Sequence, residues 1–135
     1  MKIKRLDQMF TALKDRTKKR LVAVFANDAH TVSAVAQAVE MELVEGILVG
    51  DREIILKLCK HDHIDPSIFK IVHEPEEIKA ASKSVQMINE GEGDLIMKGL
   101  VSTDKYMRAL LNKENGLLPP GSTLSHVSVI EPANY

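Results

Sequence analysis

Short apolar runs alternate with segments of helical periodicity along most of this sequence. The runs rich in Val, Ile and Leu lie at 20–26, 44–50, 69–72, 94–98 and 124–131, and we expect each to form a β-strand. Strands that alternate with helices are joined by crossover connections, which make the strands parallel and place helices on both faces of the sheet. The pattern therefore predicts an α/β fold, a three-layer sandwich with a mainly parallel sheet.

The segments between the apolar runs carry the signals of helices. Apolar residues at three- and four-residue steps predict helices at 4–16, at about 29–42, from Asp51 onward, from Pro75 to about 91–93, and from Thr103 to about Lys113. The start at Pro75 is marked further by Glu76 and Glu77. Proline suits the first turn of a helix, and carboxylates favour the positive end of the helix dipole.

The length and composition are those of one globular domain. The chain has 135 residues, of which 44% are hydrophobic and 27% charged. A domain of this size buries roughly two thirds of its unfolded surface, so it needs neither a metal nor a disulfide to fold. Cys59 is the single cysteine, which excludes an internal disulfide framework. Aromatic residues make up only 4% of the chain, which disfavours single-stranded nucleic-acid binding by aromatic stacking.

The charge is unevenly distributed along the chain. Residues 1–20 carry eight Lys or Arg and two acids, Asp7 and Asp15, whereas the rest carries a net charge of −7. Such a basic segment can bind nucleic acid or an anionic membrane, or act as a presequence, although mitochondrial presequences avoid acids. We interpret it as a solvated helix face and expect neither nucleic acid nor a membrane as a partner. The sequence shows no secretory signal or long apolar span, so we expect a cytoplasmic protein.

Two common nucleotide-binding motifs are missing from the sequence. The sequence has no Walker A pattern, and the glycines within 91–93 precede an expected strand, whereas a dinucleotide fingerprint follows one.

Ser125 and His126 suggest a nucleophile and its base. Adjacent residues on a strand point to opposite faces, however, so this pair cannot easily form a dyad. Either residue can still reach a ligand from the end of a strand.

Possible metal ligands gather in the segment CKHDHIDP. They are Cys59, His61, Asp62, His63 and Asp65. Structural zinc normally uses four closely spaced Cys or His residues, and this segment does not supply them. We interpret the segment as a polar helix end and expect no metal site.

The strongest candidate site follows the run at 94–98. Ligands of open parallel sheets bind beyond the carboxyl ends of the strands, where we expect the ammonium of Lys98 to emerge. Gly99 permits a close backbone approach or an unusual backbone angle. Ser102 and Thr103 can cap the next helix, whose N–H groups attract anions. From this pattern alone, a phosphate-binding loop and a capped helix beside an exposed lysine are equally good interpretations.

Residues 94–129, DLIMKGLVSTDKYMRALLNKENGLLPPGSTLSHVSV, resemble the phosphate acetyl- and butyryltransferases. The pattern MKG…ST…YMRALL…LSHV is more similar to the butyryl-type branch, and the upstream segments VAVFANDAHTVSAVAQA and GILVGDREIILKL also suit the family. The resemblance implies a fold similar to that of the isocitrate and isopropylmalate dehydrogenases. It also implies an acyltransferase that converts acyl-CoA and inorganic phosphate to acyl phosphate and CoA. The CoA thioester is then a substrate, and no cofactor is expected.

The resemblance also assigns roles to individual residues. Those expected to bind phosphate or to line its cleft are Lys98, Gly99, Ser102, Thr103, Ser125 and His126. Arg108 matches the family pattern as well, but it lies more than one turn past the helix start, so its expected role is weaker.

Members of this family are considerably longer than this chain. Their second half carries a Ser-Arg pair and an Asp that are thought to orient the substrate and to assist proton transfer. We therefore expect 1–135 to be the N-terminal α/β domain of a two-domain enzyme that is a homodimer in its full-length form. The catalytic residues would lie in the absent half, so the chain alone would be inactive. The alternative is a stand-alone, non-catalytic α/β module with an anion-binding or regulatory role.

Overall fold

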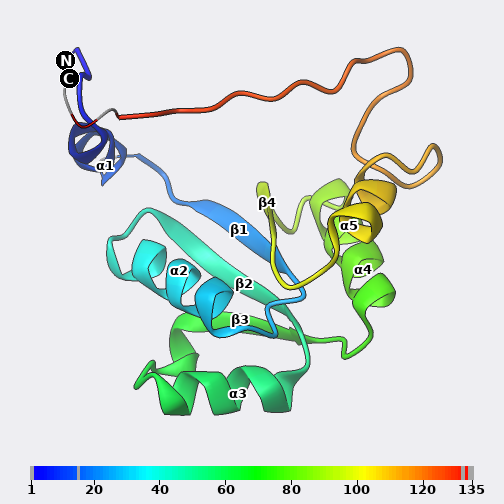
Figure 1. Ribbon diagram of the computed structural model, residues 1–135, viewed down its shortest axis with the longest axis horizontal. Helices are drawn as coiled ribbons and strands as arrows, with labels where there is room; N and C mark the ends of the chain where they lie inside the picture. Colours follow the sequence, from blue (N-terminus) through cyan, green and yellow to red (C-terminus); the bar gives the residue numbers. More distant parts are fainter. Residues whose placement is uncertain (1, 15, 132, 134–135) are drawn as a thin grey trace.

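A four-stranded parallel sheet forms the centre of the molecule, in a computed structural model that describes residues 2–14, 16–131 and 133 (Figure 1). The strands are β1 (Lys19–Val24), β2 (Val44–Gly50), β3 (Phe69–His73) and β4 (Leu95–Lys98). Their order is β3-β2-β1-β4, and each neighbouring pair is parallel. The helices are α1 (Leu6–Lys14), α2 (Ala29–Glu40), α3 (Arg52–His61), the 3-10 helix η1 (Pro66–Ile68), α4 (Glu77–Asn89) and α5 (Thr103–Leu110).

Helices cover both faces of the sheet, because successive strand residues point to opposite sides. Ala23 of β1 packs in a buried cluster with residues of α2 and α3, including Val35 and Ile55. Its neighbour Val22 packs on the other face, in a cluster that includes Met87 of α4. Figure 1 shows α2 and α3 on one side of the sheet and α4 and α5 on the other. The predicted α/β architecture with a parallel sheet between helices is confirmed. The more specific dehydrogenase-like fold stays a prediction.

Most helices begin where the sequence predicts, because polar side chains cap them. Asp28 accepts a hydrogen bond from the Thr31 amide at the start of α2. Asp51 accepts from the amides of Glu53 and Ile54 at the start of α3. Such caps satisfy amides that have no partner within the helix and typically stabilise it by about 1 kcal/mol.

Strand β1 ends two residues before the sequence predicts. Phe25 has a φ of 56°, which is left-handed and incompatible with a strand. The chain turns at this residue, and the carbonyl oxygen of Phe25 accepts a hydrogen bond of 2.9 Å from the amide of Leu100. The early end of β1 therefore brings the residues after β4 against it.

The expected last strand at 124–131 is wrong for this structure. The segment is extended and exposed, and within the described residues it pairs with no strand. Leu124, Val127 and Ile130 are 54%, 83% and 78% exposed. Figure 1 shows the segment, coloured orange to red, crossing toward α1, where Glu131 accepts a hydrogen bond from the Leu6 amide. Apolar alternation predicts a strand, but a strand forms only where a neighbour supplies hydrogen bonds.

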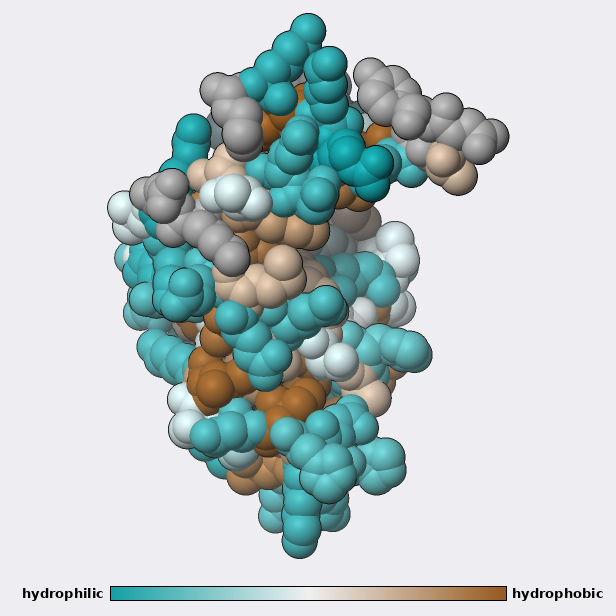
Figure 2. All heavy atoms as spheres, turned by 90° about the vertical axis from the view of Figure 1, so that its left-hand side faces the viewer, coloured by the Kyte–Doolittle hydropathy of each residue, from teal (hydrophilic) through white to brown (hydrophobic). Residues whose placement is uncertain are grey.

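The surface that carries α1 and α2 is largely hydrophilic, with apolar patches mainly in the lower half of the view (Figure 2). No helix of the described residues is long and apolar enough to cross a membrane.

Candidate functional site

The carboxyl ends of all four strands lie at one edge of the sheet, because the strands are parallel. The strands end at Val24, Gly50, His73 and Lys98, so Lys98 is the one lysine that ends a strand of the described sheet. The side chain of Asn27, after β1, contacts the backbone after β2 at this edge, because it accepts a hydrogen bond of 2.9 Å from the Asp51 amide. Lys98 therefore brings a positive charge to the edge where parallel sheets bind ligands.

Gly99 is required by close packing against the end of β1. Its amide donates a hydrogen bond of 2.9 Å to the carbonyl oxygen of Val24. A Cβ atom at position 99 would lie 2.4 Å from that oxygen and 2.7 Å from the carbonyl oxygen of Phe25. No larger residue fits here without moving the backbone. The sequence allowed either a close backbone approach or an unusual backbone angle as the reason for this glycine, and the structure shows the close approach.

The ammonium of Lys98 lies over the same loop. Its Nζ atom is 3.5 Å from the carbonyl oxygen of Gly99, which is at the outer limit of a hydrogen bond. No carboxylate of the described residues lies within salt-bridge distance of this ammonium. The charge of Lys98 is thus exposed and close to the backbone of the loop that leads to α5.

The start of α5 is held by a carboxylate from α4. The Ser102 side chain caps α5 by accepting from the Lys105 amide at 3.2 Å, and Thr103 is the first helical residue. The Ser102 amide donates to Oε1 of Glu77 at 2.8 Å, and the Lys105 ammonium binds Oε2 of Glu77 at 2.7 Å. Both oxygens of Glu77, the first residue of α4, are therefore used to fix this loop.

The charges around the loop keep Glu77 ionised. The hydrogen bond from Lys105 lowers the pKa of the Glu77 carboxyl most, followed by the hydrogen bond from the Ser102 amide, and Lys98 adds a smaller effect in the same direction. Sequence reasoning assigned Glu77 only a helix-start role. Its contacts with Ser102 and Lys105 span 25 and 28 residues, and no local pattern in the sequence signals them.

The structure does not bring Ser125 and His126 to this loop. Both lie in the exposed extended segment, which Figure 1 shows running along the top of the view toward α1, away from the loop after β4 (yellow). His126 Nε2 is 3.5 Å from the hydroxyl of Ser128, the nearest polar contact within its own segment. Arg108 is 78% exposed and pairs with Asp104 one turn earlier, at 3.2 Å, so it points along the outer side of α5.

The segment with possible metal ligands ends α3 and leads into η1. Cys59 is buried, which raises the pKa of its thiol, and His61 pairs with Asp62 at 2.9 Å. His63 has a φ of 55°, and Asp65 caps η1 by accepting from the Ser67 amide. In the part of the chain that the structure describes, no group of three or more such side chains is placed to hold a metal ion.

Known proteins resemble this chain over nearly its whole length, although no family model matches it. The phosphate butyryltransferase of Clostridium acetobutylicum is 36% identical over 133 residues, which are 98% of this chain and 44% of that protein. The phosphate butyryltransferase of Clostridium beijerinckii is 34% identical over 128 residues, 95% of this chain and 42% of that protein. The chain is a homologue of the phosphate acetyl- and butyryltransferases. The resemblance seen in the sequence motifs is thereby confirmed.

An acetyl-type relative also resembles the chain in sequence, and a solved structure shares its fold. The phosphate acetyltransferase of Rhizobium meliloti is 29% identical over 125 residues. A phosphotransacetylase from Streptococcus pyogenes superimposes with a TM-score of 0.67 at 17% identity, covering 80% of this chain and 42% of that one, which shows a shared fold. The chain spans less than half the length of these curated relatives.

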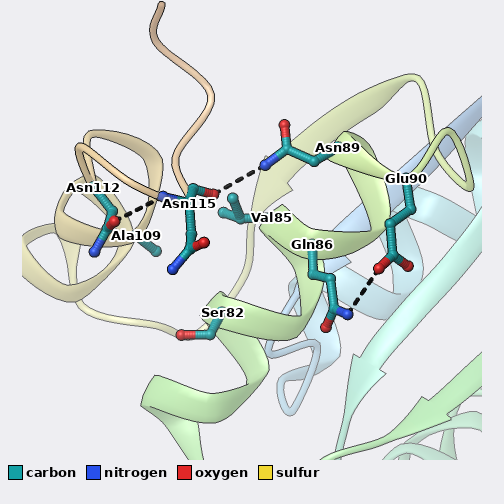
Figure 3. A pocket seen from close by; sticks show the side chains of 8 residues that line it. All are labelled: Ser82, Val85, Gln86, Asn89, Glu90, Ala109, Asn112 and Asn115. Carbon is teal, nitrogen blue, oxygen red and sulfur yellow. Dashed lines mark hydrogen bonds between the residues drawn. The ribbon is translucent and has the colours of Figure 1, made fainter.

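A cavity of about 510 Å³ lies between the later turns of α4 and the end of α5 (Figure 3). The residues that line it are Ser82, Val85, Gln86, Asn89, Glu90, Ala109, Asn112 and Asn115. Asn89 donates to the carbonyl oxygen of Asn115 at 2.9 Å, which ties the turn after α5 to α4. No lysine or arginine lines the cavity, so it offers no cation to bind an anion. The loop at Lys98 is the better candidate.

Proposed function

We propose that this chain is part of a phosphate acyltransferase that converts acyl-CoA and inorganic phosphate to acyl phosphate and CoA. Butyryl-type substrates are favoured, because the relatives that are 36% and 34% identical over almost the whole chain are named phosphate butyryltransferases. The observation that carries the proposal is the position of Lys98. It ends β4 at the edge of the sheet where open parallel sheets generally bind ligands, beside a glycine whose backbone is packed against β1.

Lys98 and the loop from Gly99 to Thr103 would hold the phosphate. A phosphate oxygen attacks the thioester carbonyl carbon, the new C–O bond forms, and the C–S bond breaks to release CoA, whose sulfur takes up a proton. Phosphate is a weak nucleophile in water, so the chief benefit is to fix it beside the carbonyl, which can lower a barrier by up to ~10 kcal/mol in the best intramolecular cases. An ammonium close to phosphate also orients its oxygens through charge-assisted hydrogen bonds.

The remaining catalytic groups would come from elsewhere in the enzyme. Donors for the developing oxyanion and for the departing sulfur are needed for full activity, and the chain spans only 44% of its Clostridium acetobutylicum relative. We expect the rest of such a transferase to supply them, with Ser125 and His126 reaching the cleft only if their segment joins the sheet. A homodimer is the expected assembly of the full-length form.

A change at Lys98 tests the phosphate site directly. Lys98→Ala should weaken the binding of inorganic phosphate to the 135-residue chain by about 10- to 100-fold, the scale of a hydrogen bond to a charged group. Isothermal titration calorimetry or phosphate-dependent NMR shifts would measure the dissociation constant. Lys57→Ala removes another exposed lysine, from the middle of α3, and should leave binding unchanged. Equal phosphate affinity in the wild type and in Lys98→Ala would contradict the proposed site.

A non-catalytic anion-binding module would use the same loop. The module differs from the enzyme in one respect. It predicts that the longest natural form of the protein binds phosphate but catalyses no acyl transfer. Similarity to named transferases over 98% of the chain favours the enzyme.

A further inference from the structure

Glu77 is the one carboxylate that contacts the start of α5 from another helix among the described residues. Its oxygens bind the Ser102 amide at 2.8 Å and the Lys105 ammonium at 2.7 Å. Glu77 is also the first residue of α4, so its side chain lies between the amino ends of two helices. Each of those ends carries a partial positive charge that favours an anion. The side chain of Glu77 is only 26% exposed, which limits screening by solvent.

The contacts of Glu77 determine which positive groups the loop offers to a ligand. Two lysines lie around the loop, but Lys105 is paired with Glu77, whereas Lys98 has no carboxylate within salt-bridge distance among the described residues. The Ser102 amide, which the sequence suggested as a phosphate donor, already donates to Glu77. A protein carboxylate thus takes the place at the start of α5 that an external anion would otherwise fill.

We propose that Glu77 sets the charge of the phosphate site, as a resident carboxylate that competes with phosphate for Ser102 and Lys105. This inference rests on the proposed function of the Lys98 loop. Phosphate that approaches Lys98 is repelled by Glu77, and phosphate that displaces the carboxylate gains the Ser102 amide and the Lys105 ammonium. Glu77 would therefore weaken phosphate binding and would keep the affinity of the site moderate.

A purely structural role for Glu77 predicts the opposite effect on phosphate binding. If Glu77 only held the loop in shape, its loss would disorder the Lys98 loop and weaken phosphate binding. Glu77→Gln separates these possibilities, because glutamine keeps the size of the side chain and an oxygen that can accept from the Ser102 amide. It removes only the negative charge and the ion pair with Lys105.

The expected gain in affinity follows from the charge that is removed. A unit charge a few ångströms from a bound anion, partly screened by water, corresponds to a change of about three- to tenfold in the dissociation constant. The gain should shrink when sodium chloride is added, because salt screens exposed charges. Lys105→Gln should have the reverse effect, since it leaves the charge of Glu77 without its main partner.

A neighbouring residue provides the matched control. Glu76 directly precedes Glu77 and is exposed, and among the described residues its carboxylate pairs only with Lys79 on its own helix, at 3.3 Å. Glu76→Gln makes the same change in net charge without touching Ser102 or Lys105. It should alter the phosphate affinity much less than Glu77→Gln does.

The experiment is an NMR titration of the 135-residue chain with inorganic phosphate, following the amides of Gly99 and Ser102. Four forms are compared, namely the wild type, Glu77→Gln, Glu76→Gln and Glu77→Gln combined with Lys98→Ala. The proposal is supported if Glu77→Gln binds phosphate more tightly than the wild type and the double variant loses this binding again. This result supports it even if phosphate binding by the wild type is too weak to measure. Unchanged or weaker binding in Glu77→Gln overturns it and leaves the Lys98 site intact if the wild type binds. If no form binds phosphate, both this inference and the proposed phosphate site fail.

Discussion

The amide of Gly99 donates a hydrogen bond of 2.9 Å to the carbonyl oxygen of Val24, so the residue after β4 is joined to the last residue of β1. The next amide, that of Leu100, binds the carbonyl oxygen of Phe25 at the same distance, 2.9 Å. The loop that carries the candidate phosphate site is therefore fixed on one side by the sheet and on the other by Glu77. Its shape depends on contacts between residues far apart in the sequence.

Gly99→Ala should destabilise the chain. The added Cβ would lie 2.4 Å from the Val24 carbonyl oxygen, and the backbone must move to relieve this clash. Overpacking of this kind lowers the free energy of unfolding by about 1–3 kcal/mol. Urea denaturation followed by circular dichroism would measure it. A value within about 0.5 kcal/mol of the wild type, the scale of an ordinary surface change, would show that the loop does not need this contact.

Asp94 should contribute to the pH dependence of stability. Its carboxylate accepts hydrogen bonds from the Arg20 backbone amide at 2.9 Å and from the Arg20 guanidinium at 3.1 Å and 3.3 Å. The side-chain hydrogen bond from Arg20 is the main cause that lowers the pKa of Asp94 below its ordinary value. A lowered folded-state pKa means that this stabilisation is present above the unfolded value and is lost as the pH falls through the folded one.

Thermal melts at a series of pH values would test this dependence on Asp94. Asp94→Asn should lower the stability at neutral pH and should flatten the loss of stability below about pH 4. Glu114→Gln is the control, because among the described residues the Glu114 carboxylate forms no hydrogen bond or salt bridge, and only its backbone amide donates, to the Asn112 side chain. Identical pH profiles for Asp94→Asn and the wild type would show that the pair with Arg20 has no energetic effect.

The extended segment should promote self-association of this chain. Val127 and Ile130 are 83% and 78% exposed, and β4 has no second neighbour in the described sheet. Exposed apolar segments and unpaired strand edges favour contacts between molecules. Size-exclusion chromatography with light scattering should show mass rising with concentration, and Val127→Ser should reduce the effect more than Thr123→Ser does. A strictly monomeric wild type at high concentration would contradict this.

The chain alone should not catalyse acyl transfer. The proposed phosphate loop is present, but the groups that stabilise the oxyanion and protonate CoA are expected in the rest of the enzyme. The assay would follow butyryl phosphate formed from butyryl-CoA and phosphate by the purified 135-residue chain. Turnover near the usual enzyme value of ~10 per second would show that these residues already contain a complete active site.

Local patterns in the sequence were enough to predict most of the fold. The strand at 44–50 was predicted with the bounds that β2 has in the structure, and the polar Asp51, which begins the next helix, marks its end. The helices expected at about 29–42, from Asp51 and from Thr103 begin there in the structure, because Asp28, Asp51 and Ser102 cap their first amides. These features depend on residues close together in the sequence, so they can be predicted from a single sequence.

Features that depend on distant partners were not predictable in this way. The run at 124–131 has the alternation of a strand, but hydrogen-bonding partners decide whether it becomes one, and here it has none among the described residues. Glu77 has the composition of an ordinary helix start, and only the folded chain places it beside Ser102 and Lys105. The role of Lys98 in phosphate binding stays a prediction, although the structure places it at the expected edge.

The position of Glu77 in the first turn of α4 links the candidate site to local unfolding. Helix ends open more often than the centre of a sheet, because fewer buried contacts hold them. Each time the first turn of α4 opens, Glu77 leaves, and the Ser102 amide and the Lys105 ammonium are released together. The amide hydrogen of Ser102 would then exchange with solvent at a rate set by the fraction of time that the first turn of α4 is open, much faster than the amides of β1 on the other side of the loop.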